Sequence, residues 1–432
     1  MRLKIVGNQI INTIKESLHQ GVLWFFGGSV VSQICGLISS IIVIRRLSKI
    51  DYGNYVDASN LYAYISMFVG LGMASAVMQF CSEKRSNRKA VYRFTLFFGE
   101  ALNLILLAVV LLIAIALRPI KGDQVSAYLS KMSCLPLVVY LHTYFEYVFR
   151  IKKDNVKYGI IQIIYSVLIL FSKIALTIIF GVDGLIYSMY LTSIICIIVE
   201  LIMLHKEGFL NEIRNTKEII EKTEKKQIIK YSAICSITNF SSRILVLLDV
   251  TCLGFILSDA EILADYNVAL SLPTALGFVA TCLITFYYPL IVEKYTNNLS
   301  SFGQYVRKIT YVFLFFSTVI SAFLFIFAPV IINVLYGEKY YTAVPVMRIL
   351  CINFFIATGF RRLFGNIIAA MKRVEINLLH TVLAGGLNII LDILFIKYLG
   401  SIGAAIATTL ITLFVTILEF MFLKKNIKAF IL

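Results

Sequence analysis

Seven ionisable residues interrupt stretches of sequence that are otherwise apolar for about 20 residues. They are Lys173, Arg243, Asp249, Arg348, Arg361, Arg362 and Asp392. If such stretches cross a bilayer, a charge at the centre costs about 2.5–3.5 kcal/mol on insertion scales, so the side chain usually faces a protein interior or a water-filled cavity. Five of the seven are cationic, and a cavity lined by them would suit an anionic substrate such as a phosphate-bearing lipid.

The seven residues divide into two candidate roles. The predicted anion contacts are the five cations, Arg243, Lys173, Arg348, Arg361 and Arg362. Lys173 could equally reach outward to the membrane surface along its flexible stem. The two acids, Asp249 and Asp392, are predicted to couple transport to a proton or sodium gradient, because short buried carboxylates need a partner or water.

Two prolines, Pro273 and Pro289, lie in one apolar segment. Each removes a backbone hydrogen bond and can kink a helix. The kink would be either a hinge that moves or a static bend.

Signs of an enzyme are few. There is no Walker-type Gly-rich loop and no HExxH motif, and the four histidines are scattered along the chain. The eight cysteines form no CxxC pair and are typical of small buried apolar residues. We therefore expect a transporter with no catalytic residues, no metal site and no cofactor, driven by an ion gradient, a substrate gradient or a partner.

The elements that must position these residues are membrane helices. The chain of 432 residues is 59% hydrophobic and only 15% charged, which excludes an ordinary soluble domain. Continuous apolar runs of about 20 residues predict helices and exclude a β-barrel, whose strands would alternate. The predicted fold is an all-α polytopic membrane protein with about twelve spans: 22–44, 56–80, 95–117, 128–149, 158–180, 185–204, 231–257, 266–292, 309–332, 344–369, 376–398 and 402–423.

The net charge of +16 is explained by membrane topology. With the N-terminus inside, about 27 of the 40 Lys and Arg residues fall in inner segments and about eight in outer loops. This bias predicts that both termini are cytoplasmic, and it argues against a nucleic-acid partner.

An internal repeat divides the chain into two halves. LSKIDYGNYVDASNL (47–61) resembles LSDAEILADYNVALSL (257–272), and a second match, at a constant offset of 219, pairs Lys153 with Lys372, Gly181 with Gly400 and Gly184 with Gly403. The glycines mark the short turns GVDG and GSIG, which predict tight helical hairpins. Each half has an even number of spans, so the halves form a parallel pseudo-repeat, two six-helix bundles around a central cavity. We predict an N-terminal lobe (1–204), a cytoplasmic linker (205–230) and a C-terminal lobe (231–432).

The chain resembles the polysaccharide transporter family of the multidrug/oligosaccharidyl-lipid/polysaccharide exporter (MOP) superfamily, which includes O-antigen and capsule repeat-unit flippases. Asp249 followed by Tyr266 and Ala269 carries part of the resemblance, although Val250 and Asp265 depart from the family's usual residues. The other segments that carry it are LSKIDYGNYVDASNLY (47–62), YYPLIVEKY (287–295), APVIINVLYGEKYYTAVPVMRIL (328–350) and NIILDILFIKYLGSIGAAIAT (388–408).

The resemblance implies a flippase of the bacterial plasma (inner) membrane. Its substrate would be an undecaprenyl-diphosphate-linked oligosaccharide for lipopolysaccharide O-antigen, capsule or exopolysaccharide synthesis, moved by alternating access. Its diphosphate would contact the predicted cations. Implied partners are membrane lipids and the polymerase and glycosyltransferases of the pathway.

Two other functions stay open. A cation-coupled multidrug exporter of the same superfamily would need a cavity dominated by acids. A membrane enzyme of glycan polymerisation would need a long outer loop, and the predicted topology has none.

Overall fold

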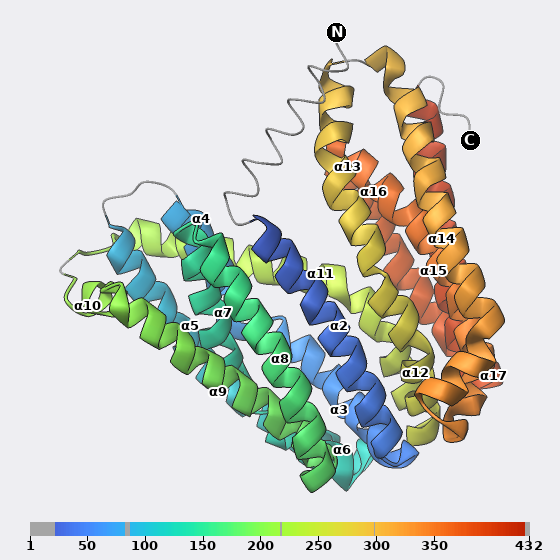
Figure 1. Cartoon of the computed structure of the whole chain (residues 1–432), viewed down its shortest axis with the longest axis horizontal. Helices are drawn as coiled ribbons and strands as arrows, with labels where there is room; N and C mark the ends of the chain where they lie inside the picture. The colour runs from blue at the N-terminus through green and yellow to red at the C-terminus, as the bar shows by residue number, and fades with distance from the viewer. Residues whose placement is uncertain (1–21, 83–86, 217, 298, 428–432) are drawn as a thin grey trace. The chain divides into compact units, whose positions relative to one another are not determined.

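The computed structural model describes residues 22–82, 87–216, 218–297 and 299–427, and every regular element among them is helical (Figure 1). Helices satisfy all backbone hydrogen bonds within one segment, which hydrocarbon surroundings require. The predicted fold class, an all-α polytopic membrane protein, is confirmed. The predicted position of both termini concerns residues 1–21 and 428–432, which lie outside the described residues.

Two compact units make up the chain. The first unit comprises the residues up to Arg46 and Leu61–Ser241, and the second comprises Leu47–Asn60 and the residues from Ser242. The predicted lobes were divided at 205–230. The observed units instead group 47–60 with the second half of the chain and 205–241 with the first.

The helices of the first unit are α2 (Val22–Arg46), η1 (Val69–Gly72), α4 (Met73–Ser82), α5 (Arg88–Lys121), α6 (Asp123–Lys131), α7 (Leu135–Ile151), α8 (Asn155–Phe180), α9 (Val182–Lys206) and α10 (Phe209–Arg214). In this unit α8 packs against α2 and α9 (Figure 1). Two helices, α3 (Lys49–Ser66) and α11 (Lys222–Ile256), have residues in both units.

The helices of the second unit are α12 (Ala260–Leu276), α13 (Phe278–Asn297), α14 (Leu299–Leu335), η2 (Glu338–Ala343), α15 (Val344–Ile356), η3 (Ala357–Arg361), α16 (Arg362–Ala370) and α17 (Val374–Asn426). Its apolar core includes Phe302 and Phe313 of α14 and Phe364 of α16. In the first unit the corresponding core is built around Tyr140 and Tyr144 of α7, whose hydroxyls donate to backbone carbonyls of α5.

Nine helical stretches among the described residues are long and apolar enough to cross a membrane. The twelve predicted spans all fall on helices, and the counts differ for three reasons. Helix α7 has 17 residues, the apolar stretch found in α11 among the described residues is the shorter Val246–Ile256, and α17 holds the last two predicted spans in one run. A straight helix of its 53 residues would be about 80 Å long, against a hydrocarbon core of about 30 Å. The run is broken at Gly400, between the two spans.

The repeat reappears in the backbone. Gly181 and Gly400 share a φ of 59°, with ψ of −133° and −135°. Lys153 and Lys372 share a φ of 60°. After each glycine break the helices approach closely, because a Cβ at Gly184 would lie 2.0 Å from the Leu176 carbonyl oxygen and one at Gly403 would lie 2.2 Å from that of Phe395. The tight hairpins predicted at GVDG and GSIG are therefore present.

Candidate functional site

A cavity of about 630 Å³ lies within the second unit. Its walls come from α11, α12, α15, η3, α16 and α17, and its lining residues range from Val246 to Glu419. Among them are Asp249, Arg361, Arg362 and Pro273, which the sequence singled out. The cavity thus brings one predicted coupling acid together with two predicted anion contacts.

Asp249 and Asp392 meet beside this cavity in one hydrogen-bonded cluster. The Asn388 amide nitrogen donates to Asp392 Oδ2 at 3.1 Å and lies 3.5 Å from Asp249 Oδ1. The hydroxyl of Tyr266 donates to Asp249 Oδ2 at 2.6 Å, and that of Thr408 donates to the same oxygen. Both acids are buried, and Asp392 is fully so.

The two acids are satisfied unequally. Asp249 accepts three hydrogen bonds, whereas Asp392 Oδ2 accepts one from Asn388 and Asp392 Oδ1 has no hydrogen-bond partner among the described residues. Two buried carboxylates this close repel each other unless a proton or a cation lies with them. The cluster offers carboxylate, amide and hydroxyl oxygens, which suit a proton or a hard monovalent cation. No group of three or more His, Cys, Asp or Glu within the described part of the chain is arranged to hold a metal ion.

The cationic side of the cavity is built on an irregular helix. Residues Ala357–Arg361 form a π-helical turn between α15 and α16, a feature often found at functional sites. The turn is followed directly by Arg362, so two guanidinium groups reach the cavity from adjacent positions. Arg361 is half-buried and interacts electrostatically with Glu419, another lining residue.

Arg362 is held by a break between two helices. Its Nη1 donates to the carbonyl oxygen of Gly277 at 2.7 Å. Gly277 separates α12 from α13 and follows Pro273 by four residues. The Gly277 carbonyl also accepts from the backbone N–H of Thr281 at 3.4 Å, and at this break between two helices it orients a cavity arginine. Pro289 is exposed within α13 and does not line the cavity.

Neutral polar groups complete the lining. They are Thr274, Asn353, Thr358, Asn366, Asn377, Thr381, Asn388, Thr408 and Thr412. Amides and hydroxyls both donate and accept hydrogen bonds. The cavity can therefore offer directional contacts to a hydroxyl-rich ligand as well as charge to an anion.

The other predicted anion contacts lie elsewhere. Arg243 and Arg348 are exposed and do not line this cavity, and the guanidinium of Arg348 lies 5.6 Å from the ring centre of Phe325. Lys173 is half-buried on α8 of the first unit. The structure brings together two of the five predicted cations.

Several site residues were missed from the sequence. Asn388 precedes Asp392 by four residues, and this spacing places both on one helix face. This four-residue spacing could have identified Asn388 from the sequence. Glu419 is an acid within the last predicted span and could also have been found, whereas the contribution of Thr408 depends on tertiary packing alone.

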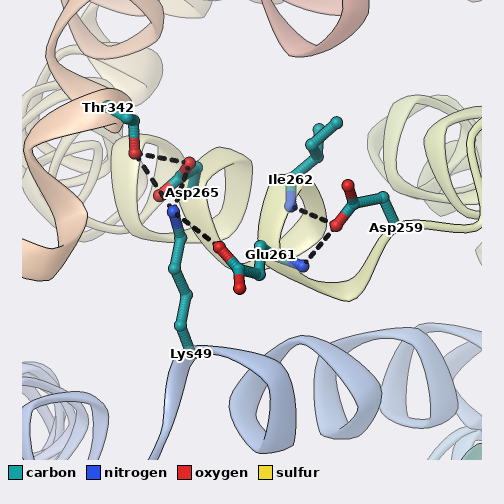
Figure 2. A network of polar contacts seen from close by, with 6 residues as sticks. All are labelled: Lys49, Asp259, Glu261, Ile262, Asp265 and Thr342. Atoms are coloured by element: carbon teal, nitrogen blue, oxygen red, sulfur yellow. Dashed lines mark hydrogen bonds and ion pairs between the residues drawn. The ribbon is translucent and has the colours of Figure 1, made fainter.

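A second polar network ties the start of α3 to α12 and η2 within the second unit (Figure 2). Lys49 Nζ lies 2.9 Å from Asp265 Oδ2 and 3.1 Å from the Thr342 hydroxyl, which donates to the same carboxylate. Glu261 lies 3.6 Å from Lys49. Asp265, a departure from the family pattern, therefore has a defined partner. Asp259 caps the N-terminus of α12, as Figure 2 also shows.

Comparison with known proteins agrees with this architecture. An uncharacterized membrane protein of Methanocaldococcus jannaschii is 22% identical to the chain, with an alignment covering 95% of this chain and 85% of that protein. An inward-facing multidrug resistance MATE family transporter of the MOP superfamily superposes with a TM-score of 0.73 at 16% identity, covering 92% of this chain and 95% of that one. The lipid II flippase MurJ in an inward closed conformation gives 0.72 at 15% identity, covering 93% and 87%.

The family itself is given by the sequence match. Residues 18–295, more than half of the chain, match the family described as polysaccharide biosynthesis protein. The structural likeness adds the fold of MOP-superfamily transporters. The chain therefore belongs to the polysaccharide biosynthesis protein family, which confirms the family predicted from its sequence.

Proposed function

We propose that the protein is a flippase that moves an undecaprenyl-diphosphate-linked oligosaccharide across the plasma membrane by alternating access. The observation that carries this proposal is the pair Arg361 and Arg362 in a cavity whose other polar lining residues are mostly amides and hydroxyls, together with two acids. Planar guanidinium groups bind phosphate oxygens through paired hydrogen bonds. The amides and hydroxyls would hold the sugars while the polyprenyl tail stays in lipid. O-antigen, capsule and exopolysaccharide repeat units are the substrates we propose.

We propose the Asp249–Asp392 cluster as the coupling site. Asp249 belongs both to the cluster and to the cavity lining. A proton or sodium ion bound there would change the charge next to the substrate. Binding of the ion and binding of the anion are then linked, and an ion gradient can drive the cycle. We place both termini in the cytoplasm, because of the distribution of Lys and Arg.

A second candidate function rests on the acids of the same cavity. Asp249 and Glu419 both line it, and carboxylates favour cationic ligands. An exporter of organic cations is the corresponding function. It predicts that cations bind and that polyprenyl diphosphates do not.

A binding experiment tests the proposal. The purified protein in lipid nanodiscs is titrated with undecaprenyl diphosphate, and the variants Arg361→Ala/Arg362→Ala and Arg361→Lys/Arg362→Lys are compared with it. We expect each double variant to bind at least about tenfold more weakly, a loss of about 1.4 kcal/mol, because lysine keeps the charge and loses the paired geometry.

Arg307→Ala is the matched control. Arg307 is an exposed arginine of α14 in the same unit and does not line the cavity. Wild-type affinity in both double variants would remove the arginine pair from the proposal. Tighter binding of an organic cation than of undecaprenyl diphosphate would favour the exporter.

A further inference from the structure

A buried cluster of one histidine and two glutamates lies in the first unit, which contributes nothing to the lining of the cavity described above. His142 Nδ1 lies 2.9 Å from Glu200 Oε1, and His142 Nε2 lies 3.9 Å from Glu146 Oε1. The imidazole is stacked against the ring of Tyr165, with ring centres 4.8 Å apart and planes 10° apart. Helices α7, α8 and α9 thus fix the position and the plane of the histidine.

One carboxylate of this cluster is left with an unused oxygen. Glu200 is fully buried, and its Oε2 has no hydrogen-bond partner among the described residues. A buried, ionised carboxylate without full hydrogen bonding is strongly disfavoured in an apolar interior. The side chain of Glu146 is 16% exposed and so reaches the surface of the unit.

The charged and titratable groups around the cluster leave an excess of negative charge. Those facing it are His142, Glu146, Tyr147 and Arg150 of α7, Tyr158 and Tyr165 of α8, and Cys196 and Glu200 of α9. Arg150 is the cation of this set, and its guanidinium lies over the rings of Tyr147 and Tyr158, at 5.3 and 5.5 Å from their centres. With both glutamates ionised and the histidine neutral, the set would carry a net charge of −1 even with Arg150 included. One bound proton removes that charge.

We propose that His142, Glu146 and Glu200 form a proton-binding site in the first unit. In the loaded state the proton lies on Glu200 Oε1 and is donated to His142 Nδ1, while the Nε2 hydrogen of the imidazole points to Glu146. For release, Nδ1 takes the Glu200 proton and Nε2 gives its own to Glu146, directly or through one water across the 3.9 Å gap. Glu146 then delivers one proton to solvent. One proton enters and one leaves, and the imidazole changes its tautomer.

The geometry favours a proton over a metal ion. Metal bonds to nitrogen and oxygen ligands are about 2 Å long, and a histidine nitrogen already 2.9 Å from one carboxylate and a second nitrogen 3.9 Å from another do not converge on one point. The site exists whether or not the chain is a flippase. Only the coupling of its proton to transport depends on the proposed function.

Infrared difference spectroscopy tests the site without measuring transport. The full chain, carrying ¹³C-labelled glutamate, is titrated between acidic and alkaline pH in nanodiscs, and the carbonyl band of protonated glutamate is followed. Labelling separates this band from the aspartate band of the Asp249–Asp392 cluster. We expect Glu200→Gln to remove one component of the glutamate band. We expect His142→Gln to shift its midpoint by about one pH unit, a tenfold change in proton affinity.

Glu212→Gln is the matched control, because Glu212 is an exposed glutamate of the same unit, paired with Lys89. It should leave the component and its midpoint unchanged. Glutamine keeps the shape of Glu200, and Glu146→Gln, at a partly exposed position, provides a second variant that should also shift the midpoint. The proposal is overturned if Glu200→Gln gives the wild-type spectrum, if His142→Gln and Glu146→Gln leave the midpoint unchanged, or if the band responds to sodium and not to pH.

Discussion

At the scale of single residues, hydrogen bonding makes the two buried carboxylates of Asp249 and Asp392 different from each other. Tyr266 and Thr408 both donate to Asp249, so this carboxylate is stabilised by its neighbours. Asp392 Oδ2 accepts a hydrogen bond from Asn388, and Asp392 Oδ1 has no partner among the described residues. A proton or a cation is therefore bound most favourably at Asp392 Oδ1, the oxygen without a hydrogen-bond partner among the described residues.

Asp392→Asn and Tyr266→Phe should affect stability in opposite ways. Asp392→Asn removes an incompletely satisfied buried carboxylate, so we expect unchanged or higher resistance to thermal unfolding and loss of its dependence on sodium or pH. Tyr266→Phe removes a hydrogen bond to a carboxylate, so we expect a loss of about 1.5–3 kcal/mol. Thermal unfolding in detergent, with and without sodium and at several pH values, measures both. An Asp392→Asn variant that kept the wild-type ion dependence would contradict the coupling role.

The ion pair of Lys49 and Asp265 is nearly buried, with side chains 14% and 9% exposed. Removing one partner of such a pair leaves a charge without compensation. We expect Lys49→Met to destabilise the protein by up to about 3–5 kcal/mol. Asp265→Asn added to Lys49→Met should restore most of that loss, since both charges are then gone.

A double-mutant cycle in denaturant or by thermal unfolding gives the coupling energy of this pair. Lys308→Met, at an exposed lysine of α14, serves as the control. Additive effects of Lys49→Met and Asp265→Asn would show that the contact contributes nothing to stability.

At the scale of elements, the two hairpins give the strictest comparison between the halves of the chain. Gly181 and Gly400 have the same positive φ, a conformation that residues with a Cβ rarely adopt. Neither has a side-chain neighbour closer than 4.0 Å. The cost of adding a Cβ should therefore come from the backbone alone and be nearly equal at the two positions.

Gly181→Ala and Gly400→Ala should each reduce stability by about 1–3 kcal/mol. Gly386→Ala is the control, because Gly386 is helical in the same α17 and has open space around its Cβ position. It should be neutral or stabilising. Thermal unfolding of the three variants checks this, and a Gly386→Ala loss as large as the other two would contradict the backbone explanation.

Helix irregularities, more than helix number, determine where the site lies. The π-turn Ala357–Arg361 and the break at Gly277 together present Arg361 and Arg362 to the cavity. Proline at 273 signals the break in the sequence. The π-turn has no comparable signal, because the residue types of Ala357–Arg361 do not distinguish a π-helical turn from a regular helical one.

At the scale of the whole molecule, the sequence predicted where the helices lie along the chain. It did not predict which face of each helix meets the cavity. All twelve predicted spans fall on helices, because about 20 apolar residues are a direct requirement of bilayer thickness. Arg243 and Arg348 were nevertheless placed with the cavity cations, and the structure shows both exposed and outside the lining. A helix apolar on all sides carries no stripe that reveals which face meets its neighbours.

For the same reason, the sequence did not predict which residues far apart in the chain contact each other. Asp249 and Asn388 lie 139 positions apart, and no local pattern joins them. Asp249 and Asp392 were singled out because each is an acid in an apolar run, yet their meeting required the packing of α11 against α17. The acids Glu146 and Glu200 were missed, although the spacing of His142 and Glu146 already placed those two on one helix face.

The most direct test of the central claim is flipping by the purified protein in liposomes. An undecaprenyl-diphosphate-linked oligosaccharide is placed in both leaflets, a proton or sodium gradient is imposed, and the accessible sugar is followed with an added glycosidase. We predict gradient-dependent movement between leaflets by the wild type and by Arg307→Ala, and its loss in Arg361→Ala/Arg362→Ala. Wild-type protein that leaves the lipid-linked sugar unmoved, or an arginine double variant that moves it at the wild-type rate, would contradict the account.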